Sequence, residues 1–127
     1  MTMKILLVDD LLLDVVLTRR AIEDCAVRHD IVVAADGEEA WQLAGERRFD
    51  LLLLDIKMPR VDGFELMERL RAQAGWPLPV IVLSGSALAA DRARADALGA
   101  VEYVHKALDY DAFRSELKAA LGRHGFC

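Results

Sequence analysis

Four short, mostly apolar runs restrict what this chain can fold into more than any other feature. They cover residues 5–8, 51–54, 80–83 and 101–104, and polar residues follow directly where each run ends. Amphipathic segments lie between them. Short apolar runs bounded by polar residues are typical of buried parallel strands, which need helical connections. The pattern therefore predicts an α/β fold with strands and helices in alternation.

The expected elements follow from these runs and from apolar spacing. We expect five strands, at residues 3–8, 30–34, 50–54, 80–83 and 101–104. Helical periodicity predicts five helices, at 13–26, 38–46, 63–73, 87–98 and 109–121. In the first helix the apolar positions are Val16, Leu17, Ala21 and Ile22, and Gly99 supplies a stop after the fourth. The prediction is a (βα)5 domain that fills the chain, with no output domain.

The polar residues after the runs are of the kinds that handle phosphate. Asp9 and Asp10 follow the first run, Asp55 the second, Ser84 the third, and Lys106 comes two residues after the fourth. In an open α/β sheet, ligands bind outside the carboxyl ends of the strands. These side chains are therefore expected to meet at one rim, where three carboxylates suit a hard cation. The simpler alternative is that the acidic residues are helix caps or solubilising groups.

Length, composition and charge limit the number of domains and the kinds of partner that this chain can have. The chain has 127 residues, 54% of them hydrophobic, and a formal net charge of −5. This size suits one domain, and the negative charge disfavours nonspecific binding to nucleic acid or to anionic membrane. The first apolar run is too short for a signal peptide, and no run has the length that a membrane span needs.

The two cysteines have no metal-ligand spacing. Cys25 is expected in or beside the first helix, and Cys127 is the last residue of the sequence. The simplest interpretation is a reduced protein in the cytoplasm. His29, His105 and His124 have no paired ligand or nucleophile nearby in sequence, and we interpret them as surface residues.

Five segments in order resemble the receiver domain of two-component response regulators, the CheY-like family. They read KILLVDD (4–10), DIKMPRVDG (55–63), SGS (84–86), LGA (98–100) and YVHK (103–106). The resemblance covers essentially the full chain. It implies a five-stranded parallel sheet with the flavodoxin-like order 2-1-3-4-5. It also implies a phosphoacceptor that catalyses only its own phosphotransfer and dephosphorylation.

The resemblance implies a role for each site residue. Asp55 would be the nucleophile that takes a phosphoryl group as an acyl phosphate. Mg²⁺ would be bound by Asp10, Asp55 and the backbone carbonyl of Lys57, with Asp9 acting through a metal-bound water. Lys106 would neutralise phosphoryl charge, and Ser84 would bond a phosphoryl oxygen.

Four residues would carry or modulate the signal. Movement of Ser84 would signal occupancy, and Tyr103 would respond by changing rotamer, which couples the site to the face built from the fourth helix, fifth strand and fifth helix. The alternative for Tyr103 is an ordinary half-buried strand aromatic. Lys57 and Ser86 would border the path of the hydrolytic water. Lys57 would shield the acyl phosphate or pair with Asp10, so we predict slow self-dephosphorylation.

Besides Lys57 and Ser86, the chain departs from the family at two more places. Ala107 follows Lys106 where the family usually has proline, often after a cis peptide bond that a non-proline residue resists by about 3–4 kcal/mol. The bond is then either trans, with a re-routed loop, or cis under strain. Leu11, Leu12 and Leu13 stand where the family is usually polar. They are either buried or partly exposed, and an exposed leucine would widen an apolar docking surface for a helical phosphotransfer domain.

Three function classes remain open. The leading one is a phosphoacceptor switch whose partners are a sensor histidine kinase or phosphotransfer protein. Residues 16–23 and 36–40 are similar to single-domain regulators of phytochrome-type kinases, which favours a homodimer through the fourth helix, fifth strand and fifth helix. The second class, a haloacid-dehalogenase-type phosphatase, needs an acid where Lys57 stands. The third is a receiver-like interaction module that takes no phosphate.

Overall fold

The computed structural model describes residues 2–58, 61–73, 78–106 and 109–127. Ten elements alternate along the chain, as the apolar runs predict. In chain order they are β1 (Thr2–Val8), α1 (Leu12–Glu23), β2 (Arg28–Ala34), α2 (Gly37–Glu46), β3 (Leu51–Leu54), α3 (Gly63–Arg71), β4 (Val80–Ser84), α4 (Ala89–Ala97), β5 (Glu102–His105) and α5 (Tyr110–Arg123). The strands form one sheet in the order β2-β1-β3-β4-β5, and every neighbouring pair is parallel. The α/β (βα)5 prediction and its strand order are confirmed.

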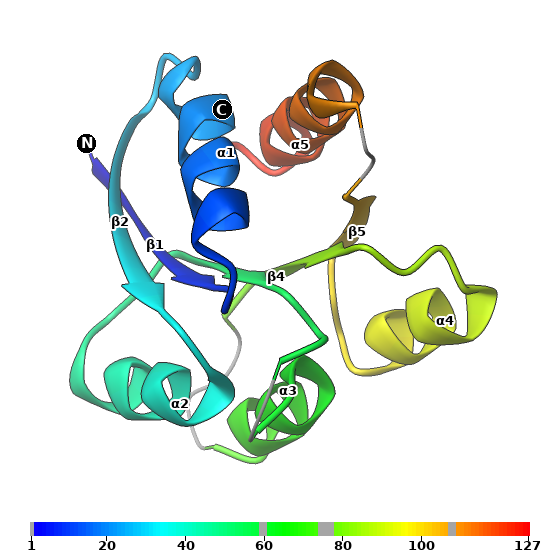
Figure 1. Cartoon of the computed structure of the whole chain (residues 1–127). Helices are drawn as coiled ribbons and strands as arrows, with labels where there is room; N and C mark the ends of the chain where they lie inside the picture. Colours follow the sequence, from blue (N-terminus) through cyan, green and yellow to red (C-terminus); the bar gives the residue numbers. More distant parts are fainter. Residues whose placement is uncertain (1, 59–60, 74–77, 107–108) are drawn as a thin grey trace.

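The sheet lies between two layers of helices. Helices α1 and α5 cover one face, and α2, α3 and α4 cover the other (Figure 1). Because successive strand residues point to opposite faces, the four leucines of β3 divide between two cores. Leu51 and Leu53 pack in the core under α1 and α5, whereas Leu52 and Leu54 pack in the core under α2 to α4. All four are fully buried, as expected for a central strand covered on both faces.

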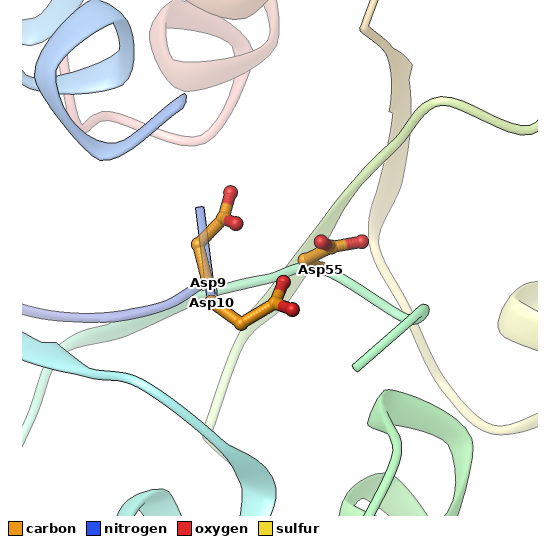
Figure 2. Close-up of side chains that lie close together, drawn as sticks. All are labelled: Asp9, Asp10 and Asp55. Carbon is orange, nitrogen blue, oxygen red and sulfur yellow. The ribbon is translucent and has the colours of Figure 1, made fainter. Parts of the chain in front are cut away.

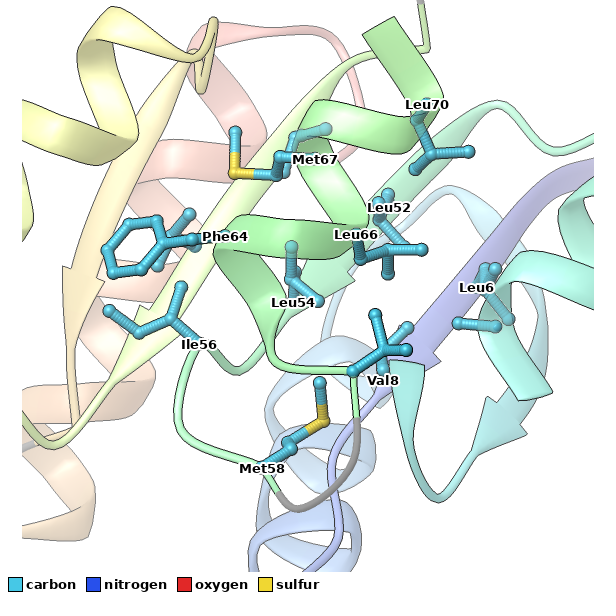
Figure 3. Packing of buried hydrophobic residues seen from close by; sticks show 14 of the residues in the cluster. Leu6, Val8, Leu52, Leu54, Ile56, Met58, Phe64, Leu66, Met67 and Leu70 are labelled. Carbon is cyan, nitrogen blue, oxygen red and sulfur yellow. The ribbon is translucent and has the colours of Figure 1, made fainter. Parts of the chain in front are cut away.

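Helix α3 shows how sequence spacing becomes packing. Its buried residues are Gly63 at the start and Phe64, Leu66, Met67 and Leu70, whose side chains share one face at helical spacing. Figure 3 shows Leu66 on the side of Leu52 and Phe64 on the side of Ile56, and all four side chains belong to the core under α2 to α4. Asp62 caps the helix, since its carboxylate accepts a hydrogen bond from the Glu65 N–H at 2.9 Å. A capped, amphipathic helix therefore fixes the end of the loop that begins at Asp55.

The phase and end of α1 differ from the prediction. The helix ends at Glu23, three residues before the expected residue 26. Val15 is buried, but Val16 is 43% exposed, so the prediction that Val16 lies on the apolar face is wrong. Thr18, which is polar, takes a fully buried place on that face instead. Because Thr18 lies on the inner face of α1 and Val16 on the outer face, the hydropathy pattern does not indicate correctly which face of the helix is buried.

The prediction that the cysteines are reduced is also wrong. Cys25 and Cys127 form a disulfide with 4.9 Å between their Cα atoms and a sequence separation of 102 residues. The physical reason is the turn after α5. Gly125 has φ +80°, a left-handed conformation that favours glycine and reverses the chain there. The chain end thus comes back beside α1 (Figure 1). Among the described residues, no helix has the length and apolar character to cross a membrane.

Candidate functional site

The backbone brings the expected site residues to one rim of the sheet. Asp9 and Asp55 directly follow β1 and β3, Ser84 ends β4, and Lys106 follows β5. The backbone hydrogen bonds between neighbouring strands continue past the strand ends. The Asp55 N–H donates to the Val8 carbonyl at 2.9 Å, and the Lys106 N–H donates to the Ser84 carbonyl at 2.7 Å. Side chains far apart in sequence are therefore positioned by the sheet itself.

Three carboxylates form a compact acidic cluster. Oxygen atoms of Asp9, Asp10 and Asp55 all lie within 4.8 Å of one another (Figure 2). Asp9 and Asp55 are buried, while Asp10 is exposed. Asp55 Oδ1 is held by the Lys57 N–H at 3.1 Å, and Asp9 Oδ1 by the Leu11 N–H at 3.0 Å. An all-oxygen set with one exposed member fits a hard, partly hydrated cation.

Lys106 supplies the positive charge next to this cluster. Its Nζ lies 2.6 Å from Asp9 Oδ2, 3.0 Å from Asp14 Oδ2 and 3.5 Å from Asp55 Oδ2. Asp14 is a site residue that sequence reasoning missed. The available signal was its position four residues after Asp10 in the first turn of α1, which begins at the rim. The lysine thus neutralises carboxylates from two sheet strands and one helix.

Burial and charge shift the pKa values of the two central groups. Burial raises the pKa of the Asp55 carboxyl above its ordinary value, although the Lys106 charge and the Lys57 N–H oppose this, and the Asp9 charge adds to it. For Lys106, burial works to lower the pKa. The hydrogen bond to Asp9 and the charges of Asp55 and Asp9 outweigh burial and raise the pKa above its ordinary value. Lys106 is therefore a permanent cation at neutral pH.

In metal-free buffer at neutral pH, we expect Asp55→Asn to raise the free energy of unfolding. A carboxyl whose pKa is raised by folding stabilises the fold fully below its unfolded pKa, and that contribution is lost as pH rises through the folded pKa. Asparagine does not ionise, so the advantage of the variant should shrink as pH falls toward 3.8, the ordinary pKa of aspartate. Urea unfolding in EDTA across pH measures this. A variant less stable than wild type at neutral pH would contradict the assignment.

Ser84, Ser86 and Tyr103 form a connected path away from the rim. Ser84 is fully buried, and its Oγ accepts a hydrogen bond from the Ser86 N–H at 3.0 Å. The Tyr103 hydroxyl donates to the Ser86 carbonyl at 2.8 Å, and the Ser86 hydroxyl donates to Asp91 on α4 at 2.5 Å. Tyr103 is half-buried. The loop after β4 thus joins the site to α4 and β5.

Lys57 points away from the acidic cluster. Its side chain is 67% exposed, and its Nζ lies 4.0 Å from the Asp91 carboxylate. Within the described part of the chain, it pairs with Asp91 and not, as one alternative had it, with Asp10. The peptide bond between Lys106 and Ala107, where the chain departs from the family, lies outside the described residues.

Comparison with known protein families identifies the family of this chain. A model of the response regulator receiver domain matches residues 5–118. The chain belongs to the response regulator receiver family. Protein RcaC of Microchaete diplosiphon is 35% identical over 122 residues, which cover 95% of this chain and 18% of RcaC. The chain spans less than half the length of the first curated relatives it matches.

Solved receiver structures agree in fold and size. The phosphorylated cyanobacterial phytochrome response regulator RcpA has a TM-score of 0.85 at 29% identity, covering 95% of this chain and 92% of its own. The receiver domain of the sensor histidine kinase PA1611 from Pseudomonas aeruginosa PAO1, solved with magnesium in its active-site cleft, has a TM-score of 0.81 at 29% identity, covering 97% of each chain. This receiver is thus homologous to two-component signalling proteins, which disfavours the phosphate-independent alternative.

Proposed function

We propose that this receiver accepts a phosphoryl group on Asp55 from a histidine kinase or phosphotransfer protein and thereby switches a partner-binding surface. The observation that carries the proposal is the Lys106 ammonium 3.5 Å from Asp55 Oδ2, inside a cluster of three carboxylates. A nucleophilic carboxylate, a fixed cation and an acidic metal-binding set in one pocket are what phosphoryl transfer requires.

The chemistry follows from these positions. An oxygen of Asp55 attacks phosphorus, its electron pair forms the acyl-phosphate bond, and the bond from phosphorus to the imidazole nitrogen of the donor breaks with its electrons. Lys106 balances the added negative charge. The residues that would hold Mg²⁺ are Asp9, Asp10, Asp55 and the carbonyl of Lys57, and the ion supplies further charge neutralisation at the phosphoryl oxygens.

The output begins at Ser84. Its Oγ already accepts from the Ser86 N–H, so the hydroxyl proton is available for a phosphoryl oxygen. Movement of Ser84 shifts Ser86, whose carbonyl holds the Tyr103 hydroxyl. The phosphoryl group therefore biases the position of the loop before α4, which is a population shift driven by new charge-assisted hydrogen bonds.

The decisive experiment is a mass measurement. The protein is incubated with Mg²⁺ and phosphoramidate, next to an Asp55→Asn variant and a sample with EDTA. We expect a single added phosphoryl group in the wild type with Mg²⁺ and none in either control. Addition that persists in Asp55→Asn would place the acceptor elsewhere, and no addition in the wild type would refute the proposal.

The leucines beside the site suit contact with the protein that brings the phosphoryl group. Leu11, Leu12 and Leu13 are 56%, 78% and 68% exposed, and Val16 adds to the same surface of α1. They directly follow Asp9 and Asp10 in the chain, so a protein whose phosphohistidine reaches Asp55 must lie close to them. Exposed apolar side chains clustered in this way mark an interaction site.

Replacing Leu12 with serine tests this contact. Losing one exposed leucine from an interface costs about 1–2 kcal/mol, so we expect phosphotransfer from the cognate kinase to slow roughly tenfold. The rate with phosphoramidate should stay unchanged, because a small phosphodonor can reach Asp55 without contacting Leu12. Equal slowing with both phosphodonors would show that Leu12 acts on the site itself.

Lys57 bears on how long the phosphoryl group lasts. Its ammonium lies beside Asp91 and offers no base for a hydrolytic water. We therefore expect slow self-dephosphorylation in the wild type and a several-fold faster loss in Lys57→Asn, whose shorter amide can orient a water. The decay of the phosphorylated mass over time measures both. An unchanged or slower decay in the variant would show that the side chain at residue 57 does not limit hydrolysis.

The partner class and location complete the proposal. The likeness to RcpA supports a phytochrome-type histidine kinase as the phosphodonor. Leu88 and Val101, 63% and 40% exposed near α4 and β5, support a homodimer through the α4–β5–α5 face. The net charge of −5 disfavours binding to nucleic acid or to an anionic membrane, so neither is proposed as a partner. The protein is placed in the cytoplasm, because the phosphoryl group of a histidine kinase originates from ATP.

A further inference from the structure

The Cys25–Cys127 disulfide is separate from the phosphoryl site. Cys25 lies in the connection between α1 and β2, and Cys127 follows the turn at Gly125 after α5. Neither residue is fully buried. Cys25 also lines an open cleft of about 420 Å³, together with Arg19, Glu23 and Arg28. A second thiol can therefore approach the disulfide from solvent.

We propose that Cys25–Cys127 is a thiol–disulfide exchange site for a dithiol reductant, and that its reduction loosens the chain end from α1. The inference rests on the partial exposure of both cysteines, which pack against the core under α1 and α5, and on the two arginines that line the cleft beside Cys25. The location inferred above adds to it, because disulfides in a reducing compartment are usually transient or redox-sensing. Reduction of the disulfide does not require Asp55 to be phosphorylated.

The cleft favours one direction of attack. A thiolate of the reductant enters the cleft, attacks Cys25 Sγ and forms a mixed disulfide, and the electron pair of the broken S–S bond leaves on Cys127 Sγ. Arg19 and Arg28 line the cleft beside Cys25, and their guanidinium groups attract and stabilise the incoming thiolate. The second thiol of the reductant then attacks the mixed disulfide. The protein gains two electrons and two protons, and the reductant leaves as a disulfide.

Other contacts keep the reduced protein folded. The Phe126 N–H donates to the Leu121 carbonyl at 2.8 Å, which completes the glycine turn at Gly125. Phe126 is 7% exposed and packs in the core under α1 and α5, and its carbonyl oxygen lies 2.7 Å from His29 Nε2. These interactions hold the last residues reversibly, whereas the disulfide holds them covalently. Reduction is thus a local change, in which residues 125–127 gain access to open forms.

The experiment counts thiols in the native protein. The chain is treated with dithiothreitol without denaturant, alkylated and weighed, and amide hydrogen exchange is followed at residues 121–127. We expect two alkylated cysteines, exchange at Phe126 faster by at least about tenfold, and an unchanged far-ultraviolet spectrum. The Tm should fall by roughly 10 °C, as for loss of a disulfide that closes a long loop.

Two results would overturn the proposal. One is a disulfide that resists dithiothreitol until denaturant is added, and the other is reduction that leaves exchange at Phe126 unchanged. The Cys25→Ser/Cys127→Ser variant should reproduce the reduced exchange pattern and ignore dithiothreitol, although the wild-type test stands without it. Arg28→Gln should slow reduction several-fold, while Arg20→Gln, exposed on α1 but outside the cleft, should not. Since no phosphodonor is used, failure here is distinct from failure of the phosphoacceptor proposal.

Discussion

Replacing Lys106 with methionine should slow phosphoryl uptake by Asp55 by about a hundredfold or more, because a positioned charge next to a reacting group typically contributes that much to the rate. The Lys106 ammonium lies 3.5 Å from Asp55 Oδ2 and is only 14% exposed, so water does little to screen it. Methionine is also unbranched and nearly as long as lysine, but it carries no charge. The acyl phosphate would then form without its nearest fixed counter-charge.

The measurement is the initial rate of mass gain with Mg²⁺ and phosphoramidate. Lys4→Met is a matched control, since Lys4 is exposed near the start of β1, at the opposite end of the sheet from the site. That variant should react at the wild-type rate. A far-ultraviolet spectrum checks that Lys106→Met is folded. Uptake by folded Lys106→Met at the wild-type rate would mean that the lysine serves the fold and not the transfer.

Gly63→Ala should lower the free energy of unfolding by about 2–3 kcal/mol, the usual cost of forcing an extra methyl group into packed structure. A Cβ at residue 63 would lie 2.5 Å from Ile56 Cα and 2.6 Å from the Asp55 carbonyl oxygen. Both are backbone atoms, which cannot rotate away as a flexible side chain can. The start of α3 must therefore move off the loop that carries Asp55.

Urea unfolding in the presence of Mg²⁺ measures this change, and Gly45→Ala is the control. A Cβ at Gly45, inside α2, would meet nothing within 4 Å. Alanine is the better helix former, so Gly45→Ala should stabilise the protein by up to about 1 kcal/mol. If Gly63→Ala lowers the free energy of unfolding and Gly45→Ala raises it, the loss at residue 63 comes from the close backbone contacts there. Equal effects would show that the loop adapts to the added methyl group.

The sequence predicts the sheet and its rim well because each strand and the residue after it can be recognised from a short segment of sequence. A run such as Leu51–Leu54 can be satisfied only in a strand covered on both faces, and the residue after such a run must lie at its carboxyl end. The site residues Asp9, Asp55 and Ser84 follow from that alone. Their roles came from the resemblance to receivers, and those roles stay predictions.

The features that the sequence did not reveal depend on contacts between distant helices. Cys25 and Cys127 meet because α1 and α5 share one face of the sheet and a left-handed glycine turns the chain back between them. Asp14 reaches Lys106 only because α1 starts at the rim. The phase error at Val16 has a similar origin, since hydropathy does not register which side of a helix its neighbours cover.

The alternation of the leucines in β3 has a consequence for how such a protein can change over generations. The two cores touch opposite faces of the sheet, so substitutions under α1 and α5 share few partners with substitutions under α2 to α4. Free-energy changes at such separate positions add nearly independently. A lineage can therefore vary the surface around α4, or lose the cysteine pair beside α1, without having to rebuild the opposite layer.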